Sequence, residues 1–178
     1  MVSLDGFFEG SNKEIDWHTV DSEFNAYAID FLQHLDTLLF GRVTYELMAS
    51  YWPSQDALSD DPIVANLMNS IQKVVVSNSL KKAEWNNTQL IKENIVEEIR
   101  KLKNQKGKDI AIFGSSDLAL SLIEADLIDE FRIIISPTVI GEGKSLFAGI
   151  GHRLHFKLTK SQTFSSGNVL LHYERKVN

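Results

Sequence analysis

The stretch DTLLFGRVTYE, residues 36–46, joins a short apolar strand directly to a helix at Gly41. A second stretch, DIAIFGSSDLA at residues 109–119, repeats that order of apolar strand, glycine and helix start. Strands that alternate with helices in this way are typical of α/β proteins, in which helices cover a mostly parallel sheet. The sequence therefore predicts an α/β fold, and the remaining elements follow on either side of these two joints.

The other elements are predicted from apolar spacing. We expect a first strand that ends at Asp5-Gly6 and further strands at residues 73–77, 88–91 and 131–136, and we expect helices over about residues 21–35, 43–50, 62–70, 95–103 and 118–125. The polar residues 54–61 are expected to form a loop. Residues 154–163 and 168–175 should pair as a C-terminal antiparallel hairpin around Ser165-Ser166-Gly167.

Composition limits the class of protein. The 178 residues suit a single domain spanning residues 1–178, and 43% of them are apolar, enough for a full core. The absence of cysteine excludes disulfides and thiolate metal sites. A net charge of −6 opposes nucleic-acid binding. No apolar run reaches the ~18 residues of a membrane span and no signal peptide is evident, so we expect a cytoplasmic protein without membrane contact.

Several familiar motifs are missing. Gly143-Lys144-Ser145 imitates the end of a P-loop, but Thr138 occupies the position of the required first glycine. The sequence also lacks the Gly-x-Gly-x-x-Gly fingerprint of dinucleotide-binding folds and the Gly-x-Ser-x-Gly elbow of hydrolases. His152 and His155 would fall on opposite faces of a strand, and we predict no metal site.

The two strand-to-helix joints are candidate anion sites, because ligands of open α/β sheets bind beyond the carboxyl ends of the strands. At the first joint Gly41 allows a sharp turn, Arg42 offers a guanidinium suited to phosphate, and Thr44 adds a hydroxyl. At the second, Gly114 is followed by Ser115 and Ser116. Either joint alone could be an ordinary capped helix, but together they favour the binding of a pyrophosphate.

Two weaker candidates accompany the joints. Ser77 and Asn78 follow a strand and could bind an adenosine ribose or its 2′-phosphate, although taken alone they are explained better by a plain turn after an edge strand. Near the N-terminus the carboxylates of Asp5, Asp21 and Glu23 and the rings of Trp17 and Phe24 could line a pocket for a flat ring. The alternative is that the rings belong to the core and that the acids stabilise a helix start.

Five segments together resemble the dihydrofolate reductase-like superfamily, and specifically its branch similar to the reductase domain of the bifunctional riboflavin-biosynthesis deaminase-reductase. They are SLDGFFEG (3–10), DTLLFGRVTYE (36–46), KVVVS (73–77), DIAIFGSSDLA (109–119) and DLIDEFRIIISPTVIGEGKSLF (126–147). The resemblance covers nearly the whole chain. It implies a mixed, mostly parallel eight-stranded sheet with flanking helices, and NADPH bound across the strand ends beside a pteridine or pyrimidine substrate.

The resemblance also implies roles for individual residues. Cofactor binding would fall to Gly41, Arg42, Thr44, Ser77, Asn78, Gly114, Ser115 and Ser116. Residues 5–18 would form a mobile loop over the nicotinamide, and the substrate pocket would be lined by Trp17, Phe24, Tyr45 and Met48. The proton would come from water or from one acid among Asp5, Asp21 and Glu23.

The sequence departs from the superfamily at three places. Ser22 stands where dihydrofolate reductases carry the carboxylate that binds the substrate ring, which argues against folate. Ser115 replaces the second glycine of a pair. The chain opens at Met1-Val2, where relatives have a central first strand, so this strand is either very short or begins upstream.

These observations predict an NADPH-dependent reductase that transfers hydride to a small pteridine- or pyrimidine-type molecule. It would be similar to dihydrofolate reductase and to 5-amino-6-(5-phosphoribosylamino)uracil reductase. The alternative, motivated by Ser22, is a catalytically silent nucleotide-binding, oligomerising domain of the same fold. Family likeness also suggests that two copies pair as a homodimer.

Overall fold

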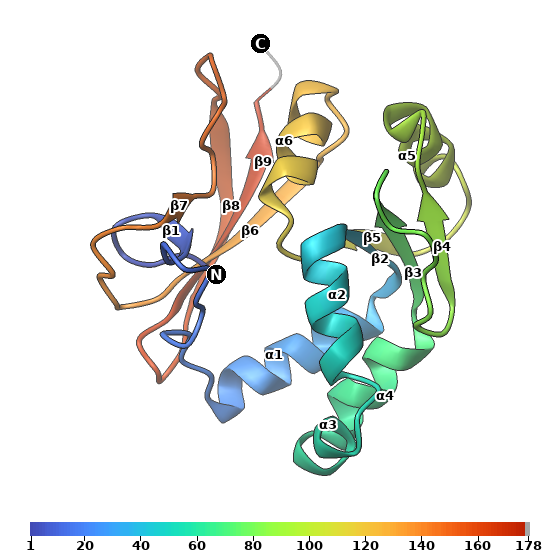
Figure 1. The fold of residues 1–178 in the computed structure, drawn as a ribbon. Coiled ribbons are helices and arrows are strands. Elements are labelled where there is room, and N and C mark those ends of the chain that lie inside the picture. The colour runs from blue at the N-terminus through green and yellow to red at the C-terminus, as the bar shows by residue number, and fades with distance from the viewer. Residues whose placement is uncertain (177–178) are drawn as a thin grey trace. The chain divides into compact units, whose positions relative to one another are not determined.

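The computed structural model describes residues 1–176 and confirms the α/β fold. The described part of the chain contains six helices: α1 (Ser22–Gln33), α2 (Arg42–Tyr51), α3 (Gln55–Asp60), α4 (Pro62–Ser70), α5 (Ile95–Lys103) and α6 (Ser116–Glu124) (Figure 1). Its strands are β1 (Phe7–Glu9), β2 (Leu35–Gly41), β3 (Gln72–Val76), β4 (Thr88–Ile91), β5 (Asp109–Ile112), β6 (Glu130–Ile135), β7 (Lys144–Ser145), β8 (Phe156–Thr163) and β9 (Val169–Arg175).

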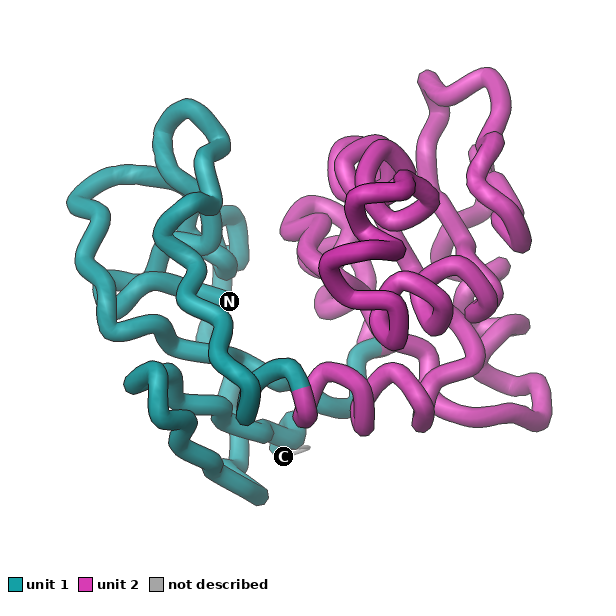
Figure 2. The backbone as a smooth tube through the Cα atoms, turned by 90° about the horizontal axis from the view of Figure 1, so that it is seen from below, with its two compact units in different colours: residues 1–25, 128–178 teal, residues 26–127 magenta. Residues whose placement is uncertain are grey.

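The chain divides into two compact units, coloured separately in Figure 2. Unit 1 comprises residues 1–25 and those from 128 onward, and unit 2 comprises residues 26–127. The expectation of a single domain stays a prediction. The expectation of eight strands in one sheet also stays a prediction, because the described strands are grouped into sheets of four, three and two. No helix among residues 1–176 is long and apolar enough to cross a membrane.

Unit 2 is built on a parallel four-stranded sheet in the order β4-β3-β2-β5. Strand β2 lies inside the sheet with β3 on one side and β5 on the other, and Leu38, Leu39 and Phe40 are almost fully buried. A continuous apolar run is what a strand covered on both faces requires. Because β2 and β5 are parallel neighbours, the turns at their carboxyl ends lie at the same edge of the sheet.

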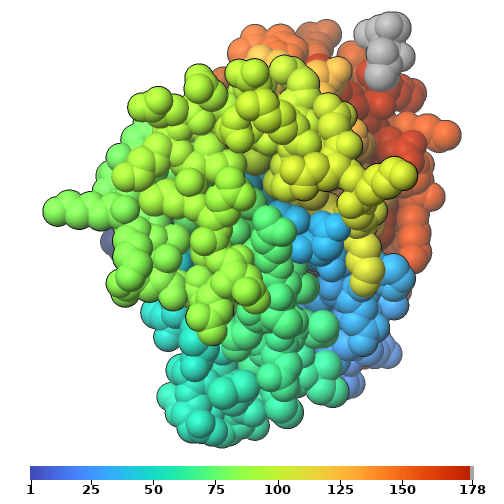
Figure 3. All heavy atoms as spheres, turned by 90° about the vertical axis from the view of Figure 1, so that its right-hand side faces the viewer, coloured from blue at the N-terminus to red at the C-terminus, as the bar shows by residue number. Residues whose placement is uncertain are grey.

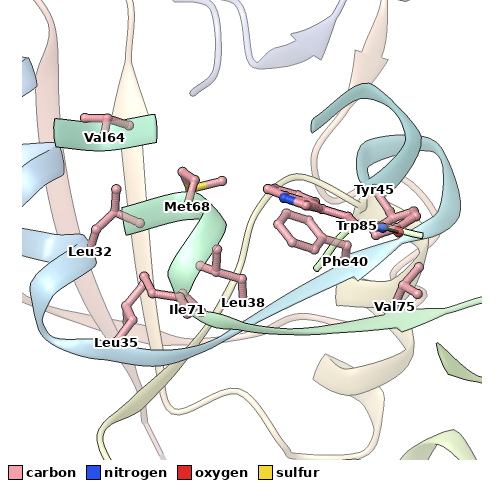
Figure 4. Packing of buried hydrophobic residues seen from close by; sticks show 11 residues of the cluster. Leu32, Leu35, Leu38, Phe40, Tyr45, Val64, Met68, Ile71, Val75 and Trp85 are labelled. Atoms are coloured by element: carbon pink, nitrogen blue, oxygen red, sulfur yellow. Dashed lines mark hydrogen bonds between the residues drawn. The ribbon is translucent and has the colours of Figure 1, made fainter. Parts of the chain in front are cut away.

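The core of unit 2 packs against one side of this sheet (Figure 4). Its members come from α1, β2, α2, α4, β3 and the connections beside β3: Leu32, Leu35, Leu38, Phe40, Tyr45, Val64, Met68, Ile71, Val75 and Trp85. One charged residue is buried in this region. The Lys73 side chain is 0% exposed, and its ammonium donates to the carbonyls of Met68, Asn69 and Ile71 beside the end of α4.

Unit 1 contains the antiparallel sheet β6-β9-β8 and the short pair β1-β7. The predicted C-terminal hairpin is confirmed as β8 and β9, which pair from Phe156 opposite Arg175 to Thr163 opposite Val169. The N-terminal strand is short: Val2 makes an isolated parallel bridge to Ile135, and β1 begins only at Phe7. The expected first strand is thus reduced to the segment at Val2, which exchanges backbone hydrogen bonds with Ile134 and Ser136, and the chain turns at Asp5-Gly6, where we predicted that this strand ends.

Two other boundaries differ from the sequence predictions. Residues 55–60 form α3 rather than a loop, because the Ser54 hydroxyl caps the helix by accepting from the amide of Ala57 at 3.2 Å. The first helix ends at Gln33, whereas we predicted residue 35. Leu35 fits the apolar spacing of the helix equally well, but it is the first residue of β2 and pairs with Asp109.

Candidate functional site

The turns that follow β2 and β5 are joined through one side chain. The Ser115 hydroxyl accepts a hydrogen bond from the amide of Gly41 at 2.7 Å and donates to the Thr44 hydroxyl at 3.0 Å. Residues from the two predicted anion sites, 74 and 71 positions apart in the chain, are thus in direct contact. The expectation that the two joints lie side by side is met within unit 2.

Both glycines at these turns are needed for the close approach. A Cβ on Gly41 would lie 3.0 Å from the Ser115 hydroxyl, and a Cβ on Gly114 would lie 3.1 Å from the Thr44 hydroxyl. Gly114 also has a φ of +61°, which favours glycine. The next residue, Ser115, has a φ of 58° although it carries a side chain, so two successive residues adopt the left-handed conformation.

Helix α2 presents a basic N-terminus at this edge. No side chain caps the helix at Gly41, so its first turn keeps amide donors and the positive end of the helix dipole. The exposed Arg42 guanidinium is 2.8 Å from the Glu46 carboxylate on the next turn. An exposed pair of this kind is weak, about 0.3–0.5 kcal/mol, so Glu46 restrains Arg42 only slightly.

A cavity of about 670 Å³ lies in unit 2 beyond the end of β3, between the first turns of α5 and α6. Its apolar walls come from Val76, Ile95, Val96 and Leu118, and its polar groups from Asn94, Glu97, Asp117 and Ser121. Both helices start from a left-handed residue without a side-chain cap, Asn94 for α5 and Ser115 for α6. In Figure 3 the yellow-green atoms of α5 and its neighbouring loops form the upper part of this face of unit 2.

The remaining cofactor candidates differ in accessibility. Ser116 is buried as the first residue of α6. The Ser77 hydroxyl is also mostly buried and accepts from the amides of Ser79 and Leu80, so it holds the turn after β3. Asn78 is exposed on that turn and is the member of the pair that a ligand can reach.

The three candidate acids lie in unit 1, and each accepts backbone hydrogen bonds. Asp5 accepts from the amides of Ile140 and Gly141 and from the Ser3 hydroxyl. Several hydrogen bonds lower the pKa of Asp5 below its usual value, and the bond from the Ser3 hydroxyl has the largest effect. A carboxylate held in its ionised form is a poor proton donor near neutral pH. A catalytic role for these acids stays a prediction, and the geometry gives them a structural one.

Asp21 and Glu23 join the start of α1 to the terminal hairpin. Asp21 caps the helix by accepting from Phe24 at 2.7 Å, and its second oxygen accepts from Ser166 at 2.6 Å. Glu23 accepts from Ser165 at 2.8 Å. The contact from Phe24 to Asp21 is the helix-stabilising role that we weighed as the alternative to catalysis, and the contacts from Ser165 and Ser166 attach the hairpin to the same carboxylates.

We expect Asp21→Asn to lower the melting temperature at pH 7. Hydrogen bonds, first that from Phe24, lower the pKa of Asp21 in the folded chain, so its stabilising contribution is present above the unfolded pKa and is lost as pH falls below about 4. Melting curves of both proteins should therefore differ at pH 7 and converge near pH 3. Asp16→Asn, an exposed change in the same segment, is the control, and equal curves for Asp21→Asn and wild type at pH 7 would contradict a stabilising role for the ionised carboxylate of Asp21.

The candidate pocket residues fall into two groups. In unit 1 the Phe24 ring packs edge-on against Phe164 at 5.7 Å, and Trp17 packs against His18 at 4.4 Å. Burial lowers the pKa of His18 to about 4, so its ring is neutral at pH 7. The indole nitrogen of Trp17 is buried without a hydrogen-bond partner among residues 1–176.

In unit 2, Tyr45 is a buried member of the core and Met48 is partly buried against it, so their expected place in the substrate pocket stays a prediction. Tyr45 is buried, and its hydroxyl accepts from the amide of Trp85 at 3.0 Å. Met48 accepts a hydrogen bond from the indole of Trp52. The open side of α2 carries instead Val43, Leu47 and Tyr51, which the sequence analysis missed, although their spacing of four residues marks one helix face.

Comparison with known proteins identifies the family. Residues 1–170 match the model of the RibD C-terminal domain. The chain therefore belongs to the RibD C-terminal domain family, and the resemblance inferred from the sequence is confirmed. It is also 39% identical over 172 residues to "Uncharacterized protein YyaP" of Bacillus subtilis (strain 168), covering 97% of this chain and 90% of that protein.

Solved structures support the same fold. A protein from Shewanella sp. PV-4, assigned provisionally to riboflavin biosynthesis, matches with a TM-score of 0.74 and 24% identity over 99% of this chain and 96% of its own. Dihydrofolate reductase from Enterococcus faecalis, complexed with NADP(H), matches with a TM-score of 0.65 and 18% identity over 99% and 93%. The chain thus has the fold shared by these two groups of proteins.

Proposed function

We propose that this protein is an NADPH-dependent reductase that transfers hydride to a small pteridine- or pyrimidine-type molecule. The single observation that carries the proposal is the contact between the Gly41 and Gly114 turns through Ser115. It brings a guanidinium and an uncapped helix start to one edge of a parallel sheet, where α/β proteins bind nucleotides. Membership of the RibD C-terminal domain family and the likeness to dihydrofolate reductase support the same chemistry.

The residues present suit a dinucleotide. Glycines at positions 41 and 114 let the two turns pack against each other, and the first-turn amides of α2 and α6 would supply donors to a pyrophosphate. Arg42 and Asn78 would hold the phosphate and ribose of the adenosine half. The cavity lined by Val76, Ile95 and Leu118 offers apolar walls suited to an adenine ring.

When bound, NADPH supplies the hydride, and the protein supplies binding and orientation. Arg42 and the helix starts would fix the cofactor by its phosphates, far from the reacting carbon. Orientation of this kind is worth up to ~7–11 kcal/mol of the barrier in well-arranged reactions. The carboxylates of Asp5, Asp21 and Glu23 are engaged with backbone amides, so water is the proton source that the geometry favours.

We expect Arg42→Ala to weaken NADPH binding about tenfold, the effect of losing one charge-assisted hydrogen bond to phosphate. Titration followed by tryptophan fluorescence or calorimetry measures the change. Arg100→Ala removes the same charge from an exposed position in the last turn of α5 and should bind as wild type does. Unchanged affinity in Arg42→Ala, or no NADPH binding by the wild-type protein, would contradict the proposal.

A second assay distinguishes catalytic turnover of NADPH from NADPH binding alone. The alternative of a silent nucleotide-binding domain is favoured by Ser22, which leaves no carboxylate at the expected ring-binding position. NADPH oxidation in the presence of dihydrofolate or of the riboflavin-pathway pyrimidine would exclude that alternative. NADPH binding without oxidation with either substrate would support it.

A further inference from the structure

One strip of the exposed side of α2 is apolar, and the exposed polar residues Arg42, Glu46 and Ser50 lie beside it. Val43 is 52% exposed, Leu47 52% and Tyr51 42%, and they follow one another at intervals of four residues. Residues at this spacing lie on one side of a helix, so the three side chains form a continuous stripe. The stripe begins one residue after Arg42, next to the proposed cofactor site.

The far end of the stripe is strongly acidic. Residues 43–72 contain no lysine, arginine or histidine, but they contain four acids, Glu46, Asp56, Asp60 and Asp61. Glu46 is paired with Arg42 at the near end. The Tyr51 hydroxyl donates to the Asp60 carboxylate at 3.3 Å, which places the negative charge directly at the end of the apolar face.

These carboxylates also affect the ionisation of Tyr51. Desolvation and the charges of Asp60, Asp56 and Asp61 raise the pKa of the Tyr51 hydroxyl above its usual value. An anionic group in the same place would meet the same carboxylates and be repelled. A cationic group would be attracted, and an aromatic ring could pack on Leu47 and Tyr51.

We propose that the stripe of Val43, Leu47 and Tyr51 on α2 receives an aromatic substrate whose end at Tyr51 and Asp60 is positively charged and carries no phosphate. This inference rests on the proposed reductase function and narrows its substrate class. It argues against a substrate that places a phosphate at this end, because Asp60 and its acidic neighbours lie beside Tyr51 and the exposed Arg42 lies at the opposite end of α2.

Three probes of nearly the same shape test the charge preference: benzamidine, benzamide and benzoate, which carry charges of about +1, 0 and −1 at neutral pH. Trp52 reports binding, because its ring packs against Tyr51 at 5.1 Å. Titrations use the wild-type protein with and without NADPH. We expect benzamidine to bind most tightly, benzamide less tightly and benzoate least.

Two substitutions connect this preference to the stripe. Asp60→Asn should reduce the ratio of benzamidine to benzamide affinity about two- to fivefold, as expected for one exposed charge pair. Leu47→Ser should weaken both probes equally. Glu84→Gln is the matched control, because it removes one negative charge from an exposed position paired with Lys82 and should leave the ratio unchanged.

The outcomes separate this inference from the reductase proposal. If NADPH binds but benzoate binds as tightly as benzamidine, or if Asp60→Asn and Glu84→Gln behave alike, the charge preference is overturned and the cofactor site stands. If benzamidine binds with the expected preference but NADPH does not bind, the charge preference of the stripe is supported and the reductase proposal fails.

Discussion

Lys73→Met should destabilise the protein by about 2–4 kcal/mol, the largest effect on stability that we expect from a single change. The Lys73 ammonium donates to three carbonyls, at 2.9 Å from Met68, 3.0 Å from Asn69 and 2.7 Å from Ile71, and lies 4.5 Å from the centre of the Trp85 ring. Methionine fills similar space but leaves these carbonyls without that donor, which costs about 1–3 kcal/mol for each fully unpaired group. Relief of the buried charge offsets part of the loss.

Urea unfolding at two pH values tests this role. Burial lowers the pKa of Lys73 to about 8, below its usual 10.5, so the unfolded chain holds the proton more tightly than the folded one. Stability contributed by Lys73 should therefore rise as pH increases from about 8 toward 10.5. The difference between wild type and Lys73→Met should be larger at pH 9.5 than at pH 7. Lys106→Met, on an exposed turn, should change stability by less than about 0.5 kcal/mol, and an equally small effect of Lys73→Met would refute the stabilising role of the Lys73 ammonium.

Gly114→Val should reduce NADPH affinity at least a hundredfold, the largest functional effect expected from one residue. Gly114 has a φ of +61°, and a β-branched residue is strained there. The added Cβ would also meet the Thr44 hydroxyl at 3.1 Å and its methyl group at 3.3 Å. Thr44 and Ser115 would be pushed apart, and the contact between the two turns would be lost together with the donors that it orients.

The smaller change Gly114→Ala keeps the test informative if the valine variant does not fold. Gly141→Ala is its control, since Gly141 has a φ of +82° but nothing lies within 4 Å of an added Cβ. Both alanine variants should lower the melting temperature, and only Gly114→Ala should weaken NADPH binding. Wild-type affinity in Gly114→Ala would show that close backbone approach at this turn is not needed for the cofactor.

Most of the fold of unit 2 could be predicted, because the local sequence of each element indicates its type. The valines of β3 and the apolar run of β2 identify buried parallel strands, and Gly41 and Gly114 mark the joints. Element ends were less predictable. Leu35 fits a helix stripe and a buried strand equally well, and only its pairing with β5 decides between them.

The candidate site was predictable in part, for a similar reason. Glycine and arginine at a strand end indicate an anion site from local sequence alone. The hydrogen bond from the Gly41 amide to the Ser115 hydroxyl joins residues 74 positions apart, so the local sequence cannot predict it. Tyr45 and Leu47 are both apolar residues of α2, and which of them faces the core depends on the position of Trp85, which sequence spacing does not give.

The hydroxyl of Ser115 has a consequence for attempts to alter cofactor preference. Since it bonds both the residue at the end of β2 and a side chain in α2, a change at position 115 reshapes both loops at once. Substitutions at 41, 44 and 115 should therefore be strongly non-additive, and a combinatorial library that varies these positions together will find functional combinations that stepwise mutagenesis would discard.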